Sequence, residues 1–177
     1  MKKFVALLLV VASLVTVLTG CTMLEKVFLF DKTNETEVSI GSSGDKFEFL
    51  ITKDSGYTMT QNKNTRHYEV KDANGTIVLT LVFYAESDLR SAIDSKRFDY
   101  QSQSRNTTSH FIYTLHKHKQ SKTEMMFTGY LIGSNTGFIG LTTTSNQSAA
   151  LDVFNHMSFN IISTKQTDAN YYPNYIK

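Results

Sequence analysis

The chain has 177 residues, 41% of them hydrophobic, which is enough apolar material for one globular domain and argues against a disordered chain. Two of the 18 basic residues, Lys2 and Lys3, precede Cys21, so the chain from Cys21 onward carries 16 basic and 16 acidic residues. This balance argues against nucleic acid as a partner, because nucleic-acid-binding proteins need a clustered basic surface. It argues equally against polybasic attraction to anionic lipid.

Residues 1–20 are typical of a secretory signal peptide. The charged residues Lys2 and Lys3 are followed by an apolar run from Phe4 to Leu18, and small residues come next. A membrane-spanning helix needs about 20 apolar residues, and this run is shorter. We therefore predict that the segment directs export and is removed.

Cys21 is the only cysteine in the chain. A lone cysteine in an exported protein cannot form an internal disulfide. It therefore either pairs with a cysteine of another chain or has a special chemical role. The residues Leu18, Thr19, Gly20 and Cys21 resemble the lipobox of bacterial lipoproteins. The resemblance covers residues 1–21. It implies a diacylglycerol thioether on Cys21, cleavage after Gly20 by lipoprotein-processing enzymes, and often a further acyl chain on the new amino terminus.

The lipobox implies a location on the extracytoplasmic face of a cell membrane. Each buried CH₂ group contributes roughly 0.8 kcal/mol, and a single acyl chain binds only marginally, so two or three chains are needed for firm anchoring. The alternative is an ordinary cleaved signal, or an uncleaved helix, with Cys21 as an idle thiol. We expect no cofactor other than the covalent lipid.

Residues 21–46 are predicted to form the lipidated amino terminus and a linker. Apolar residues at helical spacing in 23–28 indicate a short segment that lies on the bilayer or packs on the domain. The polar stretch 31–45 is typical of a linker or stalk, in which Val38 and Ile40 could form a brief edge strand.

The globular domain is predicted over 47–163, and it begins with strands. Alternating or continuous apolar residues indicate four of them. The signal Asn74-Gly75 predicts a hairpin between the last two. The predicted strands are 47–52, 57–59, 66–71 and 76–84.

The second half of the domain is predicted to mix helices and strands. Helical spacing of apolar residues indicates helices at 86–98 and 147–157. The first has acidic residues in its first turn and basic residues in its last, which the helix dipole favours. Ser145 is the predicted N-cap of the second. The polar segment 99–108 is predicted as an exposed loop, and 164–177 as a flexible tail. The predicted strands are 109–118, 124–132, 138–143 and 159–162.

This order predicts an α+β fold, in which an antiparallel sheet of about six strands packs against two helices. The rhythm of strands and helices resembles the PsbP-like and DcrB-like domains, small α+β domains often carried by exported or lipid-anchored proteins. The turn at 133–137 and the segment 159–162 behind the last helix belong to that rhythm. The resemblance covers roughly 47–163 and implies a PsbP-like sandwich. No residue-level motif supports the resemblance, so no functional residue can be assigned from it.

Three histidines are the candidates for metal ligands. His110, His116 and His118 share strand parity, and the last two would lie about 7 Å apart on one face. Imidazoles suit Zn, Cu or Ni, and Glu124 from the next strand could add a carboxylate. A metal site needs three or four convergent ligands, and lysines interleave with these histidines. We therefore predict a solvated polar face and no metal, with the three histidines as the alternative.

The sequence offers little for catalysis. It has no Gly-x-Ser-x-Gly motif, and Asp152 with His156 at i, i+4 is expected to be a surface pair on a helix. The strand tyrosines are expected to cap the edges of the core, whereas the tail tyrosines Tyr171, Tyr172 and Tyr175 could equally belong to a recognition surface. We predict no catalytic residue.

We expect a lipid-anchored extracytoplasmic lipoprotein with a non-enzymatic domain at the cell surface. Its partner would be a protein, a wall component or a small molecule. One alternative is a metal-binding or enzymatic lipoprotein that uses the three histidines. Another is an exclusion or immunity lipoprotein, encoded by a mobile element, that blocks a partner at the membrane.

Overall fold

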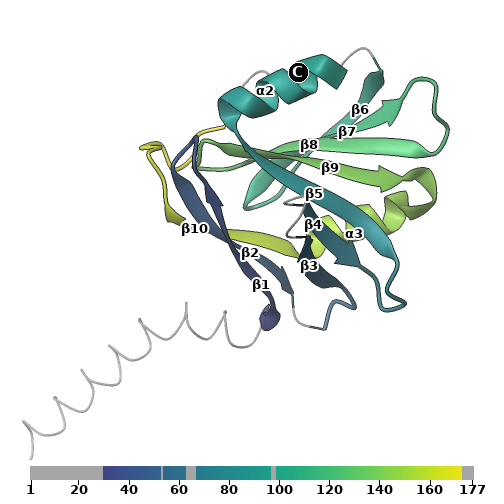
Figure 1. Cartoon of the computed structure of the whole chain (residues 1–177), viewed down its shortest axis with the longest axis horizontal. Coiled ribbons are helices and arrows are strands. Elements are labelled where there is room, and N and C mark those ends of the chain that lie inside the picture. Colours follow the sequence, from purple (N-terminus) through teal and green to yellow (C-terminus); the bar gives the residue numbers. More distant parts are fainter. Residues whose placement is uncertain (1–29, 53, 63–66, 97–98, 173–177) are drawn as a thin grey trace, which may run out of the picture.

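A computed structural model describes residues 30–52, 54–62, 67–96 and 99–172 (Figure 1). The predicted signal peptide, the lipobox with Cys21, the helical spacing at 23–28 and Tyr175 lie outside these ranges. Within the described part of the chain, no helix is long and apolar enough to cross a membrane.

Two antiparallel sheets and two helices make up the described domain, so the predicted α+β class is confirmed. The strands outnumber the prediction and form two sheets. The small sheet has the order β1-β2-β10, and the large sheet has the order β3-β4-β5-β9-β8-β7-β6. The small sheet consists of β1 (Phe30–Ile40), β2 (Asp45–Thr52) and β10 (Met157–Ser163).

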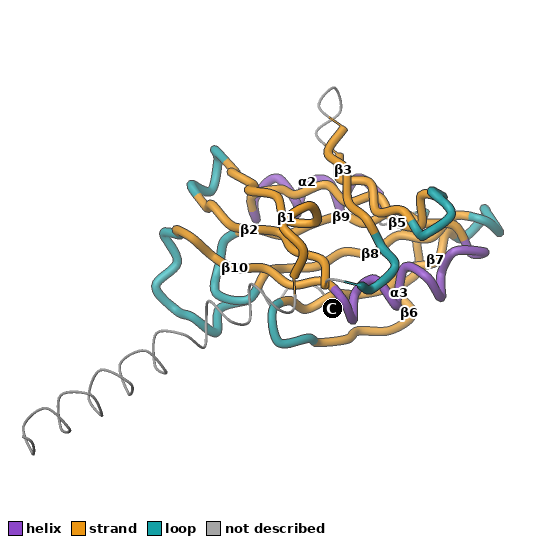
Figure 2. The backbone as a smooth tube through the Cα atoms, turned by 90° about the horizontal axis from the view of Figure 1, so that it is seen from below, coloured by secondary structure: helices purple, strands orange, loops and turns teal. Residues whose placement is uncertain are grey.

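The large sheet carries one helix on each face, as Figure 2 shows for α2 and α3. The helices are α2 (Glu86–Lys96) and α3 (Gln147–His156), the latter preceded by the short 3₁₀ helix η1 (Thr144–Asn146). The strands are β3 (Thr58–Asn62), β4 (His67–Lys71), β5 (Ile77–Ala85), β6 (Tyr100–Thr107), β7 (Phe111–His118), β8 (Glu124–Leu131) and β9 (Thr136–Thr143).

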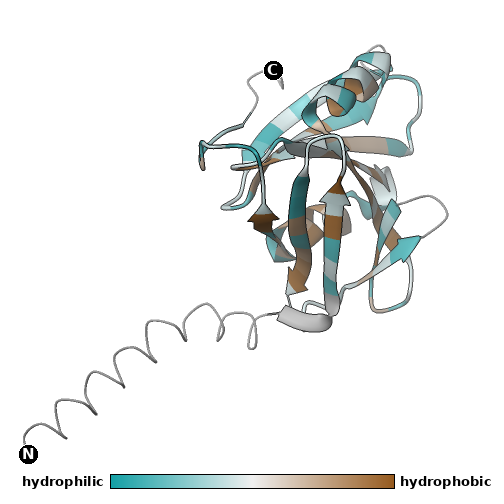
Figure 3. Cartoon of the chain, turned by 60° about the vertical axis from the view of Figure 1, so that its left-hand side comes forward, coloured by the Kyte–Doolittle hydropathy of each residue, from teal (hydrophilic) through white to brown (hydrophobic). Residues whose placement is uncertain are grey.

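The main core lies between the two sheets and under α3. Its phenylalanine rings meet edge to face, as Phe47 and Phe83 do with ring centroids 5.1 Å apart, an arrangement that aromatic quadrupoles favour. A smaller core of Leu89, Met126 and Ile139 with two tyrosines lies between the other face of the large sheet and α2. Apolar stretches accordingly lie along the strands, whereas many loops are hydrophilic (Figure 3).

The hairpin predicted at Asn74-Gly75 joins β4 to β5. The Asp72 carboxylate closes it by accepting the backbone N–H groups of Asn74 and Thr76, each at 2.9 Å. Gly75 has φ +81°, whereas Asn74 does not adopt a positive φ. Glycine is suited to this position because it has no Cβ to oppose the left-handed conformation.

The prediction of a linker over 31–45 is wrong, because this stretch forms β1, a turn and the first residue of β2. β1 pairs with β2 from Glu35 opposite Leu50 to Ile40 opposite Asp45. Val38 is only 4% exposed and reaches the core. A strand with one buried face needs an apolar residue only at every second position, so a polar composition concealed it.

The prediction of a loop over 99–108 is also wrong. Residues 100–107 form β6, the edge strand of the large sheet, and pair with β7. Seven of the eight side chains of β6 are exposed, so the strand has no apolar alternation by which it could be detected. Its hydrogen-bonded ladder with β7, the next strand along the chain, holds it in place.

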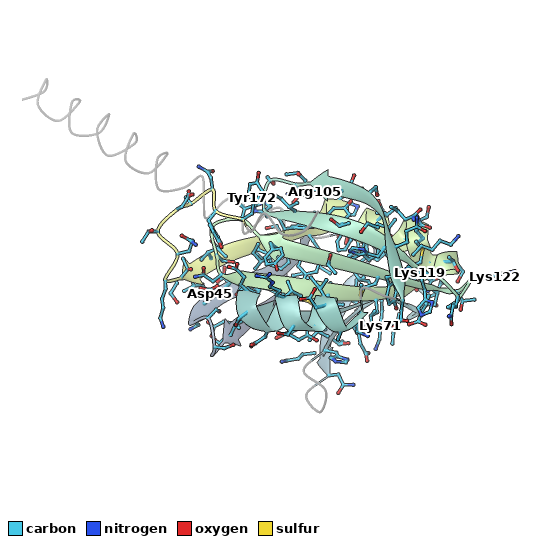
Figure 4. The ribbon with its side chains drawn as sticks, turned by 90° about the horizontal axis from the view of Figure 1, so that it is seen from above. Asp45, Lys71, Arg105, Lys119, Lys122 and Tyr172 are labelled. Carbon is cyan, nitrogen blue, oxygen red and sulfur yellow. The ribbon has the colours of Figure 1, made fainter. Side chains whose placement is uncertain are left out.

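The segment predicted as a flexible tail packs on the domain as far as Tyr172. Gly133 donates its N–H to the Tyr171 carbonyl at 3.0 Å, and the Tyr171 hydroxyl donates to Glu86 at 2.9 Å. The Arg105 guanidinium lies 5.6 Å from the centre of the Tyr172 ring, and Figure 4 shows the two side by side. These contacts tie the segment to α2 and to β6.

The second helix is confirmed, but its predicted N-cap is wrong. α3 begins at Gln147 with Asn146 in the N-cap position and no side-chain cap hydrogen bond. Ser145 lies one residue earlier in η1, where its hydroxyl is 2.9 Å from that of Thr143.

Candidate functional site

His116, one of the three candidate metal ligands, is buried on β7, between the edge strand β6 and β8 of the large sheet. Its exposed fraction is 8%. Its Nδ1 lies 3.1 Å from the Ser102 hydroxyl on β6, and its Nε2 lies 2.7 Å from the Thr128 hydroxyl on β8. Both ring nitrogens are thus hydrogen-bonded to protein, so a metal would have to displace one of these hydroxyls.

Burial lowers the pKa of His116 from 6.5 to about 4, because an imidazolium would lose its hydration in this site. The unfolded chain therefore binds more protons than the folded chain between these two pH values, and stability falls as the pH falls from 6.5 to 4. A shift of this size corresponds to roughly 3 kcal/mol.

We expect wild type to lose roughly 2 kcal/mol more unfolding free energy between pH 7 and pH 4 than a His116→Gln variant, which keeps a polar side chain but does not titrate. Urea unfolding at the two pH values measures this difference. His110→Gln, at a less buried position, is the control and should behave like wild type. Equal losses in wild type and His116→Gln would contradict the buried neutral imidazole.

His118 has a structural role at the end of β7. Its Nδ1 accepts the backbone N–H groups of Gln120 at 3.1 Å and Ser121 at 2.9 Å, and its ring packs on the Tyr100 ring with centroids 4.8 Å apart. Glu124, the expected additional ligand, instead accepts the Tyr100 hydroxyl at 3.0 Å. Burial, and next this hydrogen bond to Glu124, raise the pKa of Tyr100 to about 12.

The structure does not bring the three histidines together. His110 precedes β7, and six residues of extended chain separate it from His116, which is roughly 20 Å. Within the described ranges, no group of three or more His, Cys, Asp or Glu side chains is placed to hold a metal ion. The parity of the three histidines was predicted correctly, but the face is not solvated at His116, whose buried ring is hydrogen-bonded to Ser102 and Thr128.

Asp152 and His156 form the surface pair that their spacing predicted. The carboxylate lies 3.8 Å from the imidazole Nε2, and its side chain is 52% exposed. Its other oxygen accepts the Tyr57 hydroxyl at 2.9 Å. Burial and this hydrogen bond raise the pKa of Tyr57 to about 12. The carboxylate is thus engaged by a phenol that does not titrate near neutral pH.

A cleft of about 830 Å³ lies where the two sheets diverge, between β1 and the first strands of the large sheet. Sequence reasoning did not find it. On one side it is lined by the last residues of β1 and the following turn, 37–42, and on the other by 83–85 of β5. Gln61 of β3, Tyr68 of β4 and Asp88 of α2 complete the lining.

The cleft exists because β4 is shorter than β5. The ladder between them ends at the pair Tyr68–Leu81, whereas β5 continues beside β9 to Ala85. The last residues of β5 are therefore without a β4 neighbour, and β1 of the other sheet lies opposite them (Figure 1). Because short strands and sheet edges meet here, side chains do not fill the space completely.

The cleft has an apolar floor and a polar rim. Val38, Tyr68 and Phe83 are at most 9% exposed and form part of the floor. At the rim, Asp88 accepts the Ser42 hydroxyl at 3.1 Å, and Gln61 Nε2 donates to the Tyr68 hydroxyl at 3.2 Å. Burial raises the pKa of Tyr68, so its hydroxyl stays protonated at neutral pH.

The charged side chains in the described lining of the cleft are both carboxylates, Glu37 and Asp88. Lys46 of β2 lies 2.9 Å from Glu37, but both side chains are largely exposed, at 40% and 54%. An exposed ion pair is worth only about 0 to 1 kcal/mol, so this lysine neutralises the rim weakly. The site therefore favours a ligand that carries positive charge.

A buried carboxylate holds the turn that follows β1, next to the cleft. Asp45 is 1% exposed and accepts the Asn135 N–H and the Thr136 hydroxyl, each at 2.8 Å. It thereby holds the β1–β2 turn, including Ser42, against the start of β9. Figure 4 shows Asp45 at the end of the domain opposite Lys119 and Lys122. The cleft wall is thus rigidly tied to the large sheet.

No protein-family model, no curated protein and no solved structure matches the chain.

Proposed function

We propose that this chain is a lipid-anchored extracytoplasmic lipoprotein whose folded domain binds a ligand in the cleft beside β1 and does not change it chemically. The observation that carries the binding role is the cleft itself. Its volume of about 830 Å³, its buried aromatic floor and its few rim groups fit the general description of ligand sites in proteins.

The membrane anchor in this proposal is supported by the sequence. A charged start, an apolar run and the lone Cys21 after Leu18, Thr19 and Gly20 form one continuous pattern. A diacylglycerol group on Cys21 carries two acyl chains, which is the number that firm anchoring requires. The implied location is the outer face of a cell membrane, where the folded domain meets extracellular ligands.

A binding role is favoured over catalysis by the way the rim groups are engaged. Asp88 is exposed and accepts the hydroxyls of Ser42 and Ser87, and Glu37 is paired with Lys46. General acid–base catalysis needs positioned groups that exchange a proton with the substrate, usually with histidine among them. The described lining of the cleft contains neither histidine nor cysteine.

Metabolic labelling with an alkyne fatty acid, followed by detergent phase separation, tests the anchor. We expect the labelled chain in the detergent phase. An unlabelled chain in the aqueous phase, with a free thiol at Cys21, would refute the proposal.

A further inference from the structure

The lining of the cleft shows that it runs along the edge of a strand. Consecutive residues of β1, 37–40, all line it, as do consecutive residues 83–85 of β5. Side chains of consecutive strand residues point to opposite faces of a sheet. A hollow on one face would contact every second residue, whereas a hollow that contacts all of them follows the edge. Along β1 it extends for roughly 13 Å.

The edge of β1 that faces this hollow is not hydrogen-bonded to another strand within the described part of the chain, although β3 and β5 pass near β1. β1 lies at the end of the small sheet and pairs through its other edge with β2. A free strand edge presents a row of backbone N–H and C=O groups, and extended peptides bind such edges by adding a strand. The hollow thus offers backbone hydrogen bonds along one wall.

The other wall offers contacts for side chains. The floor residues Tyr68 and Phe83 contribute aromatic rings, which attract both apolar groups and cations. Tyr84, at the alternate position of β5, also lines the cleft but packs against the smaller core under α2. The carboxylates of Glu37 and Asp88 stand on the two sides of the cleft, one on β1 and one on α2. Alternating basic and apolar side chains on an added strand would find partners on both walls.

We propose that the cleft binds an extended, basic segment of a partner protein, which pairs with the free edge of β1 and places lysine or arginine side chains at Glu37 and Asp88. This inference rests on the binding function proposed above and specifies the class of the ligand. The remaining lining groups, Ser39, Ser42 and Gln61, then supply polar contacts at the rim of the occupied cleft.

The test uses the full, lipidated chain in uncharged detergent micelles and the fluorescent peptide Ac-KVKVKVK-NH₂, followed by fluorescence anisotropy. We expect saturable binding that weakens about tenfold in the double variant Glu37→Gln/Asp88→Asn. Asp94→Asn is the matched control, because Asp94 lies on α2 like Asp88 but is outside the cleft. It should bind like wild type. Equal affinity in wild type and the double variant would overturn the assignment of the two carboxylates.

Three further peptides test the extended form and the charge. Two carry N-methyl groups at the odd or at the even positions, so that each lacks the N–H donors of one edge. We expect at least one of them to lose binding, and the acidic peptide Ac-EVEVEVE-NH₂ not to bind. Retained affinity of both methylated peptides, or binding of the acidic one, would overturn the inference.

The same preparation separates this inference from the proposed function. Absence of peptide binding by a chain that carries the fatty-acid label would overturn the peptide inference and leave the anchor intact. Absence of the label would refute the proposed anchor whatever the peptides do.

Discussion

Replacement of Cys21 by alanine is expected to abolish acylation of the chain. Alanine has no sulfur to carry a thioether, and the chain contains no other cysteine. Two saturated chains of about sixteen carbons each contribute roughly 0.8 kcal/mol per buried CH₂, so their loss removes more than 20 kcal/mol of gross membrane affinity. Fatty-acid labelling should fall to background, and the mass should include residues 1–20 if cleavage requires the lipidated cysteine.

Thr22→Ala is the matched control for this experiment, because it makes a change of similar size one residue further on. We expect this variant to be labelled and cleaved like wild type. Fatty acid that persists on the Cys21→Ala chain would show that the lipid is attached elsewhere. Unlabelled wild type with the usual cleavage would point to an ordinary signal peptide.

The apolar run that precedes Cys21 complicates a simple fractionation experiment. If residues 1–20 remain on the Cys21→Ala chain, the segment from Phe4 to Leu18 has its own affinity for membranes, although it is shorter than a typical spanning helix. The decisive quantities are therefore the fatty-acid label and the mass of the chain. Sedimentation with membranes alone would not distinguish lipid from an uncleaved signal.

The elements that the sequence predicted correctly are those with a local signal. The helix at Glu86–Lys96 has acidic residues in its first turn and a basic residue in its last, and these oppose the helix dipole. The hairpin at Asn74-Gly75 depends on the conformational freedom of one glycine. Both signals are contained within a dozen residues, so no knowledge of the rest of the fold was needed.

β1 and β6 are edge strands that composition concealed, although a brief edge strand at Val38 and Ile40 was one predicted alternative. Each pairs with the next strand along the chain, β1 with β2 and β6 with β7. β6 is almost entirely polar, and its partner β7 supplies the hydrogen bonds that hold it. β1 inserts Val38 into the core, whereas its neighbours Glu37 and Ser39 are exposed and line the cleft. Composition favoured a loop for β6 and a linker for most of β1. Edge strands need little apolar surface, and exposed loops are polar as well, so the two are hard to tell apart by composition.

The histidines show how a correct parity argument can lead to a wrong environment. His116 does point to the face of β7 opposite Phe111, as the alternation predicted. That face was expected to be solvated, but it lies near the smaller core under α2, and Thr114 and His116 are both less than 9% exposed. Which face of a sheet a helix covers is a long-range property, so spacing along β7 could not reveal it.

The cleft could not be predicted for a similar reason. Its walls come from 37–42 and 83–85, segments that are distant in sequence and belong to different sheets. Neither segment contains a motif, and the first was assigned to a linker. The role of Asp45 could not be predicted either. In the sequence it is one charged residue in a polar stretch, and its hydrogen bonds come from Asn135 and Thr136, about 90 positions away.

Replacement of Phe154 by alanine is expected to lower the free energy of unfolding by about 3 to 5 kcal/mol. This side chain projects from α3 into the main core and is 1% exposed. Its ring centroid lies 4.6 Å from that of Tyr113 and 4.8 Å from that of Phe127, so its removal leaves a cavity that the β-sheet below is too rigid to fill. Urea-induced unfolding followed by circular dichroism measures the change.

Two further variants determine whether packing is the cause. Phe154→Leu keeps much of the apolar volume and should cost clearly less than Phe154→Ala. Asn155→Ala, on the exposed side of the same helix, should change stability by less than about 0.5 kcal/mol. Because α3 runs directly into β10 at Met157, we expect the Phe154→Ala variant to weaken the small sheet as well. Equal stability of Phe154→Ala and Asn155→Ala would contradict the placement of α3 over the core.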